Sequence, residues 1–328
     1  PKLLEGEVPV QSVTNGVHLA TWTDPEIARS PEPRALWDAR RATKRRLLDR
    51  IRSSLERSFA ERGDSPALLG RMLEGLDPNA LWIGFARRFA PYKRAHLLFR
   101  DLARLARLLS NPERPGRIVF GGKAHPHDQL GLDILKKVAL LARAEPFVGR
   151  VFFLEDYDLD LARTLVQGAD VWLNTPVRPL EASGTSGMKA AANGALNLSV
   201  LDGWWIEACD GKNGWAIGER RDHATPELQD ELDGEHLYRL LEEEVAPLFH
   251  RRDETGLPKD WLERMRHDLE TIPPVFNTSR MVAEYRDRAY APLAARWSAL
   301  SRGAGAGARD LAARHARIRR GFGEVKIR

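Results

Sequence analysis

The sequence has very little cysteine: Cys209 is the single one in 328 residues. One cysteine excludes an intramolecular disulfide and a zinc site built from cysteines. The sequence also has no signal peptide and no long apolar run. We therefore expect no metal and no membrane partner, and a reducing cytoplasm as the location.

Lysine is sparse as well, with 10 lysines among the 51 Lys and Arg residues. A lysine inside a loop of small residues is therefore informative, and Lys189 is such a lysine. The formal net charge is +5, but positive charge recurs along the whole chain in helix-like segments, which is typical of solvated helix faces. We expect no nucleic-acid partner.

Short apolar runs alternate with amphipathic segments after a charged helix predicted over residues 35–61. Strands are predicted at 81–85, 117–120, 151–154, 170–173 and 195–200, with helices at 94–109, 129–144 and 159–167. From residue 214 onward the pattern is helical, at 226–249, 259–270 and 279–298, with a Gly-rich break at 303–307 before one more basic helix. This alternation predicts an α/β fold, a doubly wound parallel sheet that binds ligands beyond the carboxyl ends of its strands.

We divide the chain into an entry segment with helices (1–75), a Rossmann-like domain (76–275) and C-terminal helices (276–328). The chain begins at Pro1 rather than methionine and ends just after a strand-like run at 325–327. We expect it to be truncated at both ends.

The segment EASGTSGMK, residues 181–189, follows the fourth predicted strand and precedes a helix-forming run from Met188. Backbone amides of Gly184 and the next three residues, at a helix N-terminus, favour an anion such as a phosphate. Lys189, expected in the first turn, could then condense with an aldehyde whose phosphate occupies the loop, which describes pyridoxal phosphate. From this loop alone, an ordinary strand-to-helix turn with a solvated lysine stays open.

A second cluster, RRFAPYKR at 87–94, follows the first predicted strand and gathers Arg87, Arg88, Lys93 and Arg94. Two adjacent phosphates require unpaired positive charge of this kind, because their mutual repulsion must be screened by fixed cations. A surface basic patch is the alternative.

Other residues could bind a sugar. Glu181 offers a carboxylate to sugar hydroxyls. The Asn-Gly turn at Asn15 and the tryptophans at 204, 205 and 215 are weaker indications of sugar binding, and for the tryptophans buried packing is favoured.

These clusters, in this order, resemble the carboxyl-terminal domain of glycogen and maltodextrin phosphorylases, a family that includes allosteric enzymes. The resemblance runs from TNGVH at 14–18 through GFARRFAPYKR, GGKAHP, FLEDYDLDLA and EASGTSGMKAAANGALNLSVLDGWW to FNTSRMVAEY at 276–285. The loops are more similar to the short bacterial and archaeal form than to the animal enzyme. The resemblance implies the carboxyl-terminal domain of a GT-B glycosyltransferase fold.

The resemblance also implies the roles of individual residues. Lys189 would form the Schiff base with pyridoxal phosphate, and the cofactor would be surrounded by Arg87, Thr185, Ser186 and Tyr157. Substrate phosphate would be bound by Arg88 and Lys93. Glucose would be bound by Glu181, Ala182, Ser183, Gly184, Asn15 and Tyr92. Two positions depart from the animal pattern: Arg87 replaces a lysine, and Asp158, to which we assign no role, replaces an arginine.

The implied activity is phosphorolysis of a terminal α-1,4-linked glucose to α-glucose 1-phosphate with retention, in which the cofactor 5′-phosphate relays a proton. A paired-carboxylate arrangement is not expected. Because the amino-terminal domain of the family does not precede Pro1, we expect the chain alone to be inactive. A homodimer is possible within the family. A nucleotide-sugar-dependent glucosyltransferase of the same fold and an inactive glucan-binding remnant are the alternatives.

Overall fold

The computed structural model describes residues 11–30, 32–219, 221 and 223–322. The described residues divide into two compact units, one of residues 14–277 and one of residues 11–13 with 278–322. The expected strand-like run at 325–327 lies outside the described residues. The division after residues 75 and 275 stays a prediction, and helices from before residue 75 belong to the same compact unit as the sheet.

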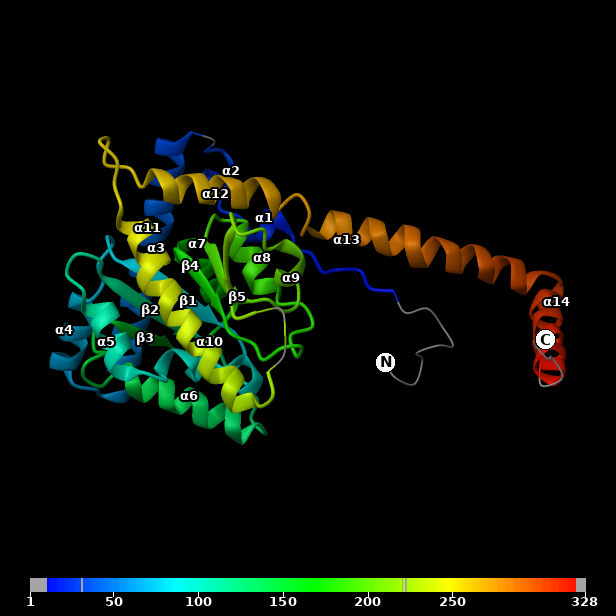
Figure 1. The fold of residues 1–328 in the computed structure, drawn as a ribbon, viewed down its shortest axis with the longest axis horizontal. Coiled ribbons are helices and arrows are strands. Elements are labelled where there is room, and N and C mark those ends of the chain that lie inside the picture. The colour runs from blue at the N-terminus through cyan, green and yellow to red at the C-terminus, as the bar shows by residue number, and fades with distance from the viewer. Residues whose placement is uncertain (1–10, 31, 220, 222, 323–328) are drawn as a thin grey trace. The chain divides into compact units, whose positions relative to one another are not determined.

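A parallel six-stranded sheet forms the centre of the larger unit in the described part of the chain (Figure 1). Its strands are β1 (Leu81–Ala86), β2 (Gly116–Gly121), β3 (Val151–Leu154), β4 (Val171–Asn174), β5 (Leu196–Val200) and β6 (Gly214–Ile217). The strand order is β3-β2-β1-β4-β5-β6, and every pair is parallel. The order reverses between β1 and β4, and in open α/β sheets ligands bind at such a switch point, beyond the carboxyl ends of the strands.

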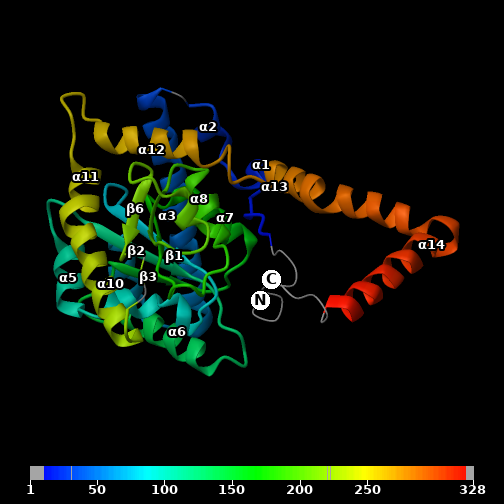
Figure 2. The ribbon, with the colours of Figure 1, turned by 45° about the vertical axis from the view of Figure 1, so that its right-hand side comes forward.

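Helices cover both faces of this sheet (Figure 2). One face packs against α5 (Leu102–Ser110), α6 (Gln129–Leu141), α10 (Pro226–Leu240), the π-helix η3 (Leu241–Val245), α11 (Ala246–His250) and α12 (Lys259–Thr271). The other face packs against α3 (Pro33–Arg62), α7 (Leu159–Gly168) and α8 (Thr185–Ala191). Alternate residues of β1 serve the two faces, since Ile83 and Phe85 join the first core and Trp82 and Ala86 the second. The doubly wound sheet is therefore confirmed.

The remaining elements are short or belong to the smaller unit. They are α1 (Leu19–Trp22), α2 (Pro25–Ala28), α4 (Pro66–Glu74), the 3₁₀-helices η1 (Pro91–Lys93) and η2 (Ala95–Phe99), α9 (Trp205–Ala208), α13 (Thr278–Tyr285), the π-helix η4 (Arg286–Tyr290) and α14 (Ala291–Phe322). The expected Gly-rich break is present within α14, where Arg302, Gly303, Ala304 and Gly305 have non-helical backbone angles. None of the described helices is long and apolar enough to cross a membrane.

The predicted secondary structure was wrong at β6 and over residues 94–109. The sequence pattern missed β6, because an edge strand of four residues that starts with a glycine is too short to show alternation. The helix predicted over 94–109 is instead divided into η2 and α5. Arg94 has a left-handed backbone (φ 47°), and Asp101 begins α5 as an N-cap whose carboxylate accepts from the Arg104 amide.

Candidate active site

Three charged side chains meet where the strand order reverses. Arg87 and Lys93 come from the loop after β1, and Glu181 comes from the loop after β4. The Nη2 atom of Arg87 donates to Oε2 of Glu181 at 3.0 Å, and Nζ of Lys93 forms an ion pair with the same oxygen. The three side chains are only 7, 10 and 10% exposed for Arg87, Lys93 and Glu181 respectively. The sheet topology thus concentrates two cations at the expected ligand crevice.

The guanidinium of Arg87 has unused donors. Its Nε and Nη1 atoms are buried and have no hydrogen-bond partner among the described residues. Burial lowers the pKa of Arg87, although the nearby Glu181 carboxylate opposes that shift. Because an unsatisfied buried donor is costly, these atoms fit an anionic ligand such as a phosphate group.

The other basic residues of this loop differ from the expectation of an unpaired cluster. Arg94 is buried in the protein, where its side chain pairs with Asp233 at 2.6 Å and Asp230 at 2.8 Å. It also donates to the carbonyl groups of Thr175 and Pro176. Arg88, by contrast, is exposed. The prediction of unpaired charge was therefore wrong for Arg94, and also for the two cations held by Glu181.

Two tyrosines lie beside this charged group. The Nζ atom of Lys93 lies 4.6 Å from the ring centroid of Tyr92. Burial raises the pKa of Tyr157, and the positive charge of Arg87 opposes that shift, which places the phenol within electrostatic reach of the guanidinium. A Cβ atom added to Gly121 would lie 3.1 Å from the Tyr157 ring, so the glycine leaves room for that ring. The structure thus brings both predicted tyrosines to the cation cluster.

The loop after β4 ends in α8, which begins at Thr185 rather than at Met188 as expected. Gly184 precedes it with a left-handed backbone (φ 87°), a conformation that favours glycine. Ser186 accepts a hydrogen bond from the indole of Trp172 at 3.2 Å. The Oγ atom of Ser183 is buried without a partner in the described part of the chain, whereas Ala182 is exposed.

Lys189 lies in the second turn of α8, so the prediction that it sits in the first turn was wrong. Its Nζ atom lies over the ring of Trp22, 3.9 Å from the centroid. Burial lowers the pKa of Lys189, whereas the contact with the Trp22 ring favours its charged form. The amine is partly buried beside the loop after β4, the place where the sequence predicts an aldehyde cofactor.

Trp22 and Asn193 were not predicted as part of this region. Asn193 donates to the carbonyl groups of Trp22 (2.9 Å) and Lys189 (2.8 Å) and accepts from the Asp24 amide. These hydrogen bonds of the buried Asn193 side chain connect α1 and α2 to the end of α8 and keep Trp22 next to Lys189. Asn193 is the first residue of the NGALN run, but nothing in the local sequence pattern connects this run to Trp22.

The segment around Asn15 lies on the same side of the sheet as α8, since Val17 belongs to the same core as Met188. The Thr14 hydroxyl donates to the Glu207 carboxylate at 2.8 Å, and the Val17 amide donates to the Phe276 carbonyl. The Phe276 ring packs edge-on against Trp204, whose amide donates to the carbonyl of Ser183. These contacts link the exposed Asn15 segment to the loop after β4. As predicted, Trp204, like Trp205 and Trp215, is buried in the core.

Comparison with known proteins decides the family. Residues 68–229 match the family model for carbohydrate phosphorylases. The chain is 43% identical to the glycogen phosphorylase of Mycobacterium bovis, over 98% of this chain and 40% of that protein. It is 41% identical to the maltodextrin phosphorylase of Thermococcus litoralis, again over 98% and 40%, and 40% identical to the glycogen phosphorylase of Aquifex aeolicus, over 88% and 45%. The chain belongs to the carbohydrate phosphorylase family.

Membership of this family agrees with the resemblance seen in the sequence and with the parallel sheet of the structure. The chain spans about two fifths of the length of the curated phosphorylases that it matches. The phosphorylase relatives give no support to a nucleotide-sugar-dependent transferase. Within this phosphorylase segment, Asp158 is the N-cap of α7, since its carboxylate accepts from the Leu161 amide at 2.8 Å.

Proposed function

We propose that this chain is the cofactor- and phosphate-binding part of an α-glucan phosphorylase. The reaction is phosphorolysis of a terminal α-1,4-linked glucose of glycogen, starch or maltodextrin, which gives α-D-glucose 1-phosphate with retention. One observation carries the proposal. Arg87 is buried beside Lys93 at the switch point of the sheet, and two of its donor atoms have no partner among the described residues.

Pyridoxal 5′-phosphate is the proposed cofactor, and the residues present fit it. Lys189 offers a partly buried amine of lowered pKa, and Arg87 offers unused donors for the cofactor phosphate. Thr185, the backbone of Ser186 and the Tyr157 phenol complete the proposed cofactor site. When bound, the cofactor supplies a phosphate that exchanges a proton with substrate phosphate.

The remaining site residues bind the two substrates. Arg88 and Lys93, with the amide of Gly184, bind inorganic phosphate, while Glu181, Ala182, Ser183, Gly184, Asn15 and Tyr92 bind the terminal glucose. The buried hydroxyl of Ser183, which has no partner in the described structure, is a polar atom of the kind that a sugar hydroxyl satisfies. Burial of the cations excludes water, and this strengthens their attraction for phosphate charge that develops during glycosidic cleavage.

The reaction also needs groups from outside this chain. The chain spans about 40% of the glycogen phosphorylase that it matches with 43% identity. We propose that an amino-terminal domain of the same protein closes the site, that the whole protein works in the cytoplasm, and that it can form homodimers. On this proposal the 328-residue chain by itself does not phosphorolyse glucans, and measurable release of glucose 1-phosphate by it would contradict that statement.

The first experiment tests the cofactor. The chain is incubated with pyridoxal phosphate, its absorbance is recorded, the product is reduced with borohydride, and the labelled peptide is identified by mass spectrometry. Label on Lys189, absent in Lys189→Arg and retained in the matched variant Lys212→Arg, supports the proposal. Label that persists in Lys189→Arg, or absence of label both here and after an amino-terminal domain is restored, contradicts it.

A second candidate, an inactive glucan-binding remnant, is tested by the same preparation. A remnant would bind glucan but neither pyridoxal phosphate nor inorganic phosphate. The retention of Lys189, Arg88 and Lys93 in the sequence favours the enzyme.

A further inference from the structure

Glu181 holds a position that the proposed reaction does not explain. Its Oε2 atom accepts from Nη2 of Arg87 at 3.0 Å and also pairs with Nζ of Lys93. A carboxylate oxygen has two lone pairs, so both acceptor sites of this atom are in use. In this arrangement Oε2 is not available to a sugar hydroxyl.

The same arrangement places one negative charge, the Glu181 carboxylate, between the two cations of the site. All three side chains are nine-tenths buried, so the attraction between them is weakly screened by solvent. A phosphate that approaches Arg87 and Lys93 meets this carboxylate at close range, and like charges at such a distance repel one another strongly in a buried site. Phosphate and the Glu181 carboxylate therefore compete for the same two cations.

The backbone of Glu181 allows the side chain to leave without movement of the loop. Its amide donates to Oδ2 of Asp202 at 2.8 Å, which anchors the main chain on the loop after β5. The amide of Trp204 in turn donates to the carbonyl of Ser183. With the main chain fixed at these two points, rotation about the side-chain bonds of Glu181 is the available motion.

We propose that Glu181 is an internal counter-ion, which the cofactor phosphate displaces from Arg87 and inorganic phosphate displaces from Lys93, and that the displaced carboxylate then becomes the acceptor for glucose hydroxyl groups. The inference rests on the proposed function. It assigns Glu181 two successive partners, and it makes phosphate binding a precondition for the strongest sugar binding at this residue.

The test is calorimetric titration of the 328-residue chain with inorganic phosphate, comparing wild type with Glu181→Gln. Removal of the competing charge is expected to tighten phosphate binding by about tenfold, a typical effect for a close, buried like charge. The matched control is Glu207→Gln, which removes a carboxylate from the same side of the sheet, where Glu207 accepts from Thr14. This control is expected to bind phosphate as wild type does.

Thermal melting provides a second readout that also shows whether each variant is folded. Without phosphate, Glu181→Gln is expected to melt below wild type, because two buried cations lose their partner. Phosphate is expected to raise the melting temperature of Glu181→Gln more than that of wild type. If Glu181→Gln does not fold, Glu181→Asp, which keeps the charge on a shorter side chain, is expected to bind phosphate at least as tightly as wild type.

The possible failures are distinct. Phosphate binding to folded Glu181→Gln that is equal to or weaker than in wild type overturns the counter-ion role, while binding to wild type still supports the proposed phosphate site. An equal gain in Glu207→Gln also overturns it, since the effect would then be one of net charge. Absence of phosphate binding in every folded variant overturns the counter-ion role and the proposed phosphate site together.

Discussion

The guanidinium of Arg87 and the carboxylate of Glu181 lie 3.0 Å apart although 94 positions separate them in the sequence. The contact follows from the topology. Because β1 and β4 are parallel neighbours in the sheet, the loops that follow them begin side by side at the same edge. The proposed phosphate site therefore depends on how charge is distributed between the loop after β1 and the loop after β4.

Arg94 and Arg88 are expected to respond in opposite ways to substitution, although both belong to the same basic run. Arg94→Ala leaves Asp233 and Asp230 without their buried cation, and we expect a loss of about 3–5 kcal/mol in the free energy of unfolding. Arg88→Ala removes an exposed side chain, so stability should change by no more than about 0.5 kcal/mol, while phosphate affinity falls about tenfold. Urea denaturation and phosphate titration of both variants measure the contrast, and similar stability losses in the two would contradict it.

Asp158 is expected to matter for stability and not for ligand binding. Its carboxylate accepts from the Leu161 amide at the first turn of α7, a bond that the arginine of the animal enzymes cannot provide because arginine has no acceptor. Asp158→Ala should cost about 1 kcal/mol in urea denaturation, and Asp158→Asn, which keeps an acceptor, should cost less. Equal losses in both variants, or weaker phosphate binding in either, would point to a role of the charge itself.

Much of the fold was predictable because its strands are continuous apolar runs. The runs at β1, β2 and β3 are buried and bounded by polar loops, so sequence alone locates them within one residue at each end. The split between η2 and α5 was not predictable from periodicity. It lies at Arg100 and Asp101, where the Asp101 carboxylate caps α5 and the Asp101 carbonyl accepts from the hydroxyl of Tyr238, a residue far along the chain.

The candidate site was predictable in its residues but not in its pairing. The sequence indicates which strands precede the basic loop and the Gly-rich loop, so their meeting at one edge follows from the fold class. Nothing local distinguishes Arg94, which is buried on Asp233, from the exposed Arg88. The contact between Lys189 and Trp22 was likewise not predictable from the sequence, because it depends on tertiary hydrogen bonds of Asn193 to the carbonyl groups of Trp22 and Lys189.

Gly203 is expected to be required for the shape of the proposed glucose-binding loop. It has a left-handed backbone (φ 55°), and an added Cβ would lie 2.4 Å from the carbonyl oxygen of Ser183. Gly203→Ala should therefore displace Ser183 and cost about 2–4 kcal/mol. The matched control is Gly63→Ala, which has a similar backbone (φ 65°) but open space around the added atom, and it should cost only about 1 kcal/mol. Equal losses would show that backbone strain, rather than the contact with Ser183, decides the effect.

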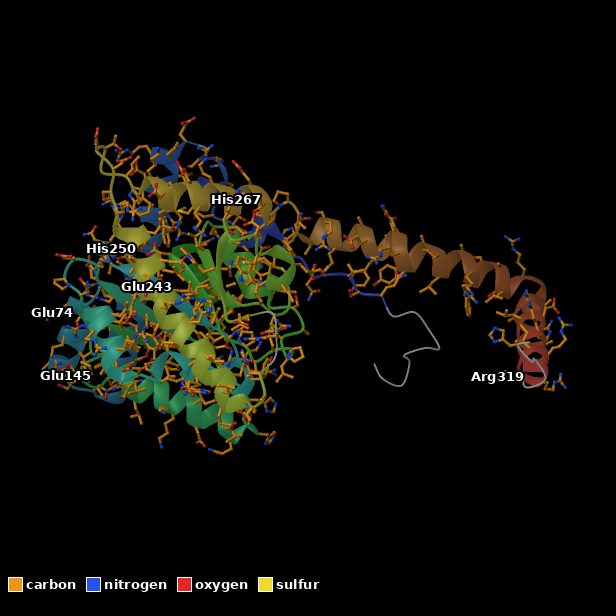
Figure 3. The ribbon with its side chains drawn as sticks, viewed as in Figure 1. Glu74, Glu145, Glu243, His250, His267 and Arg319 are labelled. Carbon is orange, nitrogen blue, oxygen red and sulfur yellow. The ribbon has the colours of Figure 1, made fainter. Side chains whose placement is uncertain are left out.

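His250 gives the larger unit a predictable sensitivity to acid. The residue lies at the end of α11 (Figure 3), where its Nε2 atom is 3.2 Å from the carbonyl oxygen of Pro115. Burial, together with the nearby cations Arg252 and Lys44, lowers the pKa of His250 to about 4 from the ordinary value of 6.5. Between these two values the unfolded chain binds a proton that the folded chain does not, so this contribution to stability is present above pH 6.5 and is lost as the pH falls toward 4.

Because the ring is only partly buried, we expect this loss to be about 1–2 kcal/mol rather than the full value implied by the pKa shift. His250→Gln removes the titrating group and should flatten the dependence of the unfolding free energy on pH between 6.5 and 4. Urea denaturation at a series of pH values measures the slope in wild type, in His250→Gln and in the control His315→Gln, an exposed histidine of α14. A slope that is the same in all three proteins would mean that His250 becomes charged as readily in the folded chain as in the unfolded one.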